Sequence, residues 1–122
     1  MSQLLIEMQE EQRAFRPGDT IKGAAFWKRD TAPKSVEIRL FWHTRGKGTE
    51  DVKVVGKEAF PEPKAEEARP FQFRAPEGPY SFSGKLISLI WGLELVAEPG
   101  AESTRIELTI SPSAREVLLP QT

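Results

Sequence analysis

Ile87-Ser88-Leu89-Ile90-Trp91-Gly92-Leu93-Glu94-Leu95 is the stretch that decides the fold. Large apolar side chains occupy positions 87, 89, 91, 93 and 95. Because successive side chains of a strand point to opposite faces, this spacing predicts a strand that buries one face. The surrounding apolar run, Leu86–Ala97, has 12 residues. A membrane span needs about 20 apolar residues, so we expect a core strand and no membrane span.

The same period of two recurs on both sides of this stretch. It is clear in Ile21–Trp27, Val36–His43 and Ile106–Ile110, and weaker in Leu4–Met8, Asp51–Lys57 and Ala68–Arg74. About seven short strands separated by turns are typical of an all-β, immunoglobulin-like antiparallel β-sandwich. The expected core contains Ile38, Leu40, Trp42, Leu89, Trp91, Leu93, Ile106 and Leu108.

Turn residues divide these strands. Arg16-Pro17-Gly18-Asp19 predicts a type II turn, in which proline presets φ at the second position and glycine supplies a positive φ at the third. We assign residues 1–112 to the sandwich and 113–122 to a C-terminal tail or edge strand. Val117-Leu118-Leu119 lies between two prolines, and an edge strand, an interaction tail and a disordered segment all fit it.

Three stretches together resemble a known family. They are Phe15–Ala25 with its aromatic-x-Pro-Gly-acid turn, the alternating Ser35–Trp42, and Ala75–Leu95 with a Pro-containing loop and a Ser-Gly-x-Leu strand entry. In this order they resemble the amino-terminal half of the arrestin-like superfamily, especially the α-arrestin and retromer-subunit branch. The resemblance implies an arrestin N-domain-like sandwich that serves as a protein-binding adaptor or scaffold.

The sequence also departs from that family. Family members commonly carry two sandwiches in tandem, and this sequence accounts for one. The adjacent lysines that sense receptor phosphates in true arrestins have no match in Leu4–Arg13. We therefore transfer the expected fold but no receptor or phosphate site, since one fold hosts many functions.

Composition narrows the function classes. Among 122 residues, 17 Lys and Arg stand against 18 Asp and Glu, which argues against the basic surface of a nucleic-acid binder. The absence of Cys removes disulfides, thiolate zinc sites and thiol catalysis, and favours a reducing compartment. Met1–Glu7 lacks a basic lead and a long apolar run, so we expect no signal peptide and a cytoplasmic location.

The sequence offers little catalytic chemistry. His43 is the single histidine, and no serine lies in a Gly-x-Ser-x-Gly elbow. Gly46–Thr49 lacks the spacing of a phosphate-binding loop, and the acidic residues are not grouped as calcium ligands. We expect a protein that is not an enzyme and binds no cofactor and no metal. The alternative is a small carbohydrate- or ligand-binding sandwich, in which Trp27, Trp42 and Trp91 would form the platform, although their strand phase favours the core.

Four apolar residues fall on the phase opposite the core: Phe26, Phe41, Val55 and Ile90. If their strands are neighbours, these side chains form a patch on an outer face, and contiguous patches mark interfaces. The sequence therefore predicts a protein-binding site for a partner or for a second copy in a homodimer. A loop or the Val117–Leu119 tail covering the patch is the competing interpretation.

Overall fold

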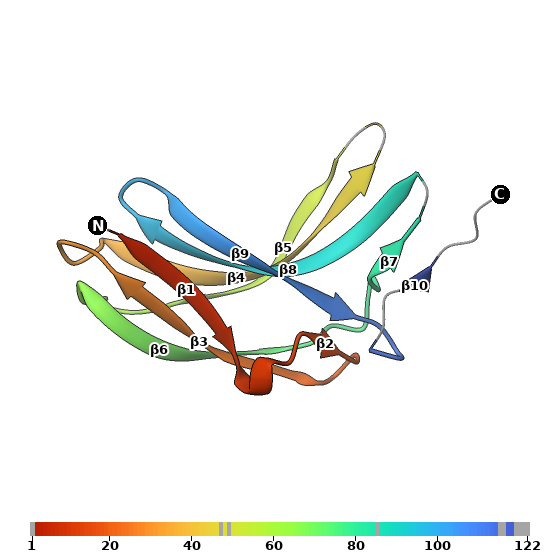
Figure 1. Cartoon of the computed structure of the whole chain (residues 1–122), viewed down its shortest axis with the longest axis horizontal. Coiled ribbons are helices and arrows are strands. Elements are labelled where there is room, and N and C mark those ends of the chain that lie inside the picture. The colour runs from red at the N-terminus through yellow and green to blue at the C-terminus, as the bar shows by residue number, and fades with distance from the viewer. Residues whose placement is uncertain (1, 47, 49, 85, 115–116, 119–122) are drawn as a thin grey trace.

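The computed structural model describes residues 2–46, 48, 50–84, 86–114 and 117–118 of the chain. Within these residues, the chain forms an all-β sandwich of two sheets (Figure 1). The small sheet has the order β1–β3–β6, with antiparallel pairing throughout. Its strands are β1 (Gln3–Met8), β3 (Thr20–Lys28) and β6 (Glu66–Arg74).

The large sheet has the order β10–β7–β8–β4–β5, and β9 also pairs with β8. Its long strands are β4 (Ser35–Gly46), β5 (Val52–Ala59), β8 (Ile87–Glu98) and β9 (Glu102–Ile110). The only helical element in the described part of the chain is η1 (Gln9–Glu11), a single 3₁₀ turn. No helix in that part is long and apolar enough to cross a lipid bilayer.

All seven strands expected from the period of two are present, which confirms the β-sandwich. Three further strands are β2 (Ala14–Phe15), β7 (Phe82–Ser83) and β10 (Val117–Leu118). Each has two residues, too few to show an alternation. The β2–β9 and β7–β10 pairs are parallel, so the sandwich is antiparallel except at these short additions.

The core lies between the facing sides of the two sheets. Six of the eight expected core residues are buried: Ile38, Leu40, Leu89, Trp91, Leu93 and Leu108. Trp42 and Ile106 are half-buried and pack against this core. Trp42 lies toward the tip of the β4–β5 hairpin, which splays away from the small sheet in Figure 1, and Ile106 lies on β9 at the margin of the large sheet.

The predicted turn before β3 is confirmed. Gly18 has a φ of +87°, and the Asp19 N–H donates to the Arg16 carbonyl over 3.0 Å. The Asp19 carboxylate also accepts the Arg16 N–H at 2.8 Å. Backbone hydrogen bonds from Gly18 to Ala75 and from Ala75 to Asp19 join this turn to the end of β6.

Candidate functional site

Apolar side chains gather on one half of the outer face of the large sheet, the side turned away from the small sheet. Leu40 and Trp91 point to the core, so their immediate neighbours along β4 and β8 point outward. Two adjacent rows run across the strands in register: Val54–Phe41–Gly92 and Val52–His43–Ile90. We call the five side chains Val52, Val54, Phe41, His43 and Ile90 the outer apolar face.

Phe41 lies flat within this face and is only 4% exposed. The ring packs on Gly92, where a Cβ atom would come within 3.0 Å of the ring Cζ. The Arg105 guanidinium lies 4.9 Å from the ring centroid, and the His43 ring stacks at 5.8 Å. The alternation placed Phe41 on the solvent phase; it does lie on the outer face, but its neighbours cover it.

Of the other three predicted site residues, Ile90 joins Phe41 on the outer apolar face, and Val55 and Phe26 do not. Ile90 is half-buried beside His43 in the large sheet. Val55 is exposed and is the extra residue of a β-bulge, because Leu40 pairs with Gly56 and Phe41 with Val54. Phe26 lies on the small sheet between Leu5 and Ala68, so it does not join the outer apolar face.

Two residues missing from the prediction are the most exposed side chains of the outer apolar face. Val52 is 61% exposed and Val54 is 46% exposed. The even spacing of Val52 and Val54 was the available signal for a shared face. The bulge at Val55 obscured this signal. An alternation without a bulge assigns Val55 to the outer side in place of Val52 and Val54.

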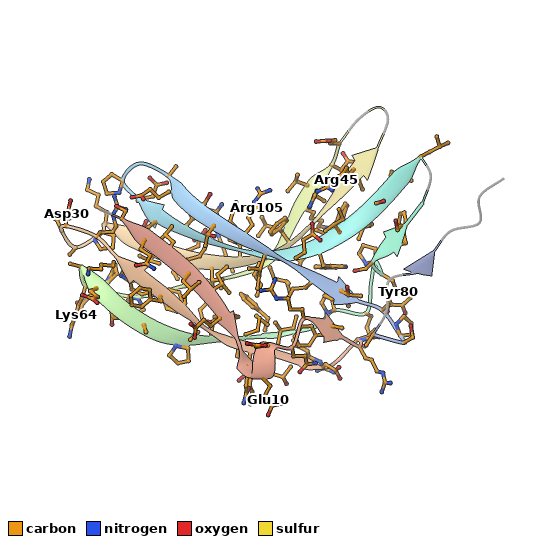
Figure 2. All side chains as sticks on the ribbon, viewed as in Figure 1. Glu10, Asp30, Arg45, Lys64, Tyr80 and Arg105 are labelled. Carbon is orange, nitrogen blue, oxygen red and sulfur yellow. The ribbon has the colours of Figure 1, made fainter. Side chains whose placement is uncertain are left out.

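The other half of the outer face is charged. Glu94 accepts Arg105 Nε at 2.7 Å and lies 3.5 Å from Arg39 Nη1, and Arg39 also pairs with Glu37. Figure 2 shows Arg45 and Arg105 on the upper side of the large sheet, away from the small sheet. The apolar rows therefore border a ladder of nearly balanced charge.

The protein has a hollow on this outer face and another along the small sheet. One of about 240 Å³ lies beside Phe41, His43 and Arg105 on the outer face. A larger one, of about 570 Å³, lies along the small sheet, and Glu58 of β5 and Phe71 of β6 line it. The smaller hollow falls below the roughly 300–1,000 Å³ typical of small-molecule sites, which suits a contact face better than a ligand pocket.

No catalytic constellation surrounds His43 in the described residues. Its ring stacks on Phe41, and Ile90 faces it across the sheet. Ser81 is buried, with its Oγ accepting the Ile110 N–H at 3.0 Å. Among the residues that the structure describes, no three His, Asp or Glu side chains group as metal ligands.

The tryptophans fix loops rather than form a surface platform. Trp27 and Trp91 are fully buried. Their indole N–H groups donate to the carbonyls of Lys64, at 2.8 Å, and Pro79, at 2.7 Å. Two of the three rings are thus unable to stack on a sugar.

The C-terminal strand β10 extends the sheet beside β7 and does not lie over the outer apolar face. Val117 and Leu118 pair in parallel with Phe82 and Ser83, at the edge of the sheet (Figure 1). Leu119, the third residue of the expected cover, lies outside the described residues. The backbone path of β10 therefore does not support the covering interpretation for Val117 and Leu118.

Comparison with known proteins gives no family assignment. No protein-family model matches the chain, and no curated protein matches it. Among solved structures, a β-glucosidase from Listeria innocua in complex with gluconolactone aligns with a TM-score of 0.46 and 10% sequence identity. The alignment covers 96% of this chain but 17% of that chain.

Proposed function

We propose that this domain is a non-catalytic protein-binding module of arrestin-like type, and that it binds a partner protein on the outer apolar face. The observation that carries the proposal is the exposure of Val52 and Val54, beside Phe41, on an outer sheet face. Large side chains left in water forgo about 1.5–3 kcal/mol each of burial free energy. A partner that covers them recovers this free energy.

The arrangement of the face supports a protein partner. Apolar side chains beside a charged border resemble the core and rim of protein interfaces. The ladder of Arg39, Glu94 and Arg105 would give a partner orientation, because paired charges at a rim mainly affect specificity and the association rate. The order of the turn and strand motifs supports the arrestin-like class.

The test begins with affinity capture from the native host and identification of the bound protein by mass spectrometry. We expect Val52→Ser with Val54→Ser to reduce capture of that partner at least tenfold, since both side chains are exposed and the fold does not depend on them. The contacts around Phe41 suggest a second variant, Phe41→Ser with Ile90→Ser, which also removes the packed part of the face.

Leu5→Ser is the matched control, because Leu5 is an exposed apolar residue on the small sheet. It should leave capture unchanged. Full capture by the folded double-valine variant would contradict the proposed face, and loss of capture in Leu5→Ser would move the site to the small sheet. Circular dichroism of each variant establishes that the fold is retained.

A further inference from the structure

β5 is an exposed edge strand of the large sheet. It is the last strand in the sheet order, and in the described residues it pairs only with β4. Edge strands carry unpaired N–H and C=O groups that accept another strand unless something blocks them. Two other edge strands are partly blocked. Pro70 removes one N–H from β6, and the parallel strand β2 covers one end of β9.

The bulge sets which backbone groups of β5 point outward. The Thr44 N–H donates to Asp51 O, and the Phe60 N–H donates to Val36 O, both at 2.9 Å. Both ends of the segment therefore turn toward β4 at Asp51 and Phe60. Because backbone groups along a strand point alternately to its two sides, the residues whose N–H and C=O groups point away from β4 are Val52, Val54, Lys57 and Ala59. We call these residues outward-facing. Because Val55 is an extra residue, the outward-facing residues have even numbers before it and odd numbers after it.

Only certain registers then allow β5 to pair with itself. In an antiparallel pair, outward-facing residues must oppose outward-facing residues. The register that uses all four sets Val52 opposite Ala59 and Val54 opposite Lys57 of the other copy. Each pair in this register joins an even-numbered residue to an odd-numbered one. Without the bulge, all outward-facing residues would be even-numbered or all odd-numbered, and this register could not form.

The same register brings opposite charges together. Lys53 then faces Glu58 of the other copy, and two-fold symmetry repeats the pair. Both side chains point to the inner side of the sheet, because Lys53 lies opposite Trp42 and Glu58 opposite Ile38. Neither one forms an ion pair within the described residues.

Glu58 has space beside it for an incoming side chain. It is half-buried and lines the hollow of about 570 Å³ next to Pro70 and Gln72 of β6. Glu7 and Lys22 also line this hollow. A lysine entering beside Glu58 would find a carboxylate that the described chain leaves without a partner.

We propose that β5 pairs antiparallel with β5 of a second copy of this chain, so that the two large sheets form one continuous sheet across a two-fold axis. Backbone phase and charge select the same register independently. The charges of Lys53 and Lys57 disfavour pairing with most other strands, as edge lysines commonly do. Glu58 favours pairing with β5 of a second copy, because it offsets the charge of Lys53 there. The pairing uses the backbone groups of β5 and the inner side chains of Lys53 and Glu58. The outer apolar face uses the outer side chains of Val52 and Val54, so this proposal does not depend on the proposed function.

A charge-swap cycle tests the register. Sedimentation of the full chain over a range of concentrations should give a dimer. Lys53→Glu alone and Glu58→Lys alone each place like charges opposite one another twice, and we expect each to weaken the dimer roughly tenfold. The double variant K53E/E58K restores both pairs, and its dimerisation should return to near the wild-type value.

Two further variants sharpen the result. Lys28→Glu, on β3 of the other sheet, is the matched reversal and should leave the dimer intact. Lys57→Pro removes an outward N–H while sparing the bonds to β4, so the folded variant should be monomeric. Thermal melts by circular dichroism show that each variant is folded.

Three results would overturn the proposal. The first is a wild-type protein that is monomeric at every concentration, including one that binds a strand of another protein instead. The second is a pair of single charge reversals that leave the dimer unchanged, and the third is a double variant that remains monomeric. Val52→Ser with Val54→Ser keeps all backbone groups of β5. Loss of partner capture with retention of the dimer, or the reverse, therefore distinguishes the two proposals.

Discussion

Gly92 supports the outer apolar face by its lack of a side chain. A Cβ atom there would lie 2.8 Å from the Ile106 carbonyl oxygen and 3.0 Å from the Phe41 ring. We expect Gly92→Ala to destabilise the domain by about 1–3 kcal/mol, the usual cost of overpacking. Gly56→Ala is the control, since a Cβ atom there would lie 3.4 Å from its nearest neighbour, the Phe73 ring. Urea unfolding measures both, and an equal or larger loss at Gly56 would contradict this account.

Trp91 combines full burial with a loop contact. Its ring lies in the core, and its N–H donates to the Pro79 carbonyl at 2.7 Å. Trp91→Ala should cost about 3–5 kcal/mol of unfolding free energy, with a smaller loss for the half-buried Trp42→Ala. Denaturant melts that show a loss below about 1 kcal/mol for Trp91 would be incompatible with a core position.

Gly18 needs the left-handed backbone conformation. With φ at +87°, an alanine there is strained although its Cβ would come no closer than 3.9 Å to a neighbour, Arg74 Nη2. Gly18→Ala should destabilise the domain by more than the ~0.4–1 kcal/mol that alanine contributes where it fits. Gly18→Asn should lose less, because asparagine tolerates positive φ. Equal thermal stability of all three proteins would exclude strain at this turn.

At the scale of elements, a carboxylate and a guanidinium hold the connection between β5 and β6. Glu67 accepts Arg69 Nε at 2.6 Å and the Lys64 N–H at 2.9 Å. Arg69 also donates to the Pro61 carbonyl at 2.7 Å. The hydrogen bond from Arg69, followed by that from the Lys64 backbone, lowers the pKa of the Glu67 carboxyl below its ordinary value of 4.5.

This lowered pKa predicts a pH-dependent contribution to stability. Because the folded state holds the Glu67 proton more weakly than the unfolded state, the contribution is present above pH 4.5 and is lost as the pH falls through the lowered folded pKa. Glu67→Gln should therefore lower the melting temperature at pH 7, with the difference from wild type shrinking in acid. Glu66→Gln removes the adjacent exposed carboxylate as a control. A difference that stays constant with pH would contradict the prediction.

Across the whole molecule, the alternation of apolar residues predicted the seven longer strands because each buries one face. It could not assign strands to sheets, and this is why Phe26 was grouped with Phe41 although they lie on different sheets. It also could not reveal the bulge at Val55, because a bulge depends on the partner strand. Phe41 was assigned to the correct side, but its burial depends on Gly92 and Arg105, from strands far along the chain.

The parallel pairing of β2 with β9 has a consequence for the order in which the nascent chain can fold. The Thr109 N–H donates to Arg13 O at 2.8 Å, and the Ser111 N–H to Phe15 O at 3.1 Å. These bonds join the start of the chain to its last long strand. At a synthesis rate of roughly 5–20 residues per second, about 95 residues separate the partners, so β2 waits on the order of 5–20 seconds for β9. During that interval Phe15, which is buried in the finished sandwich, lacks the strand with which it pairs.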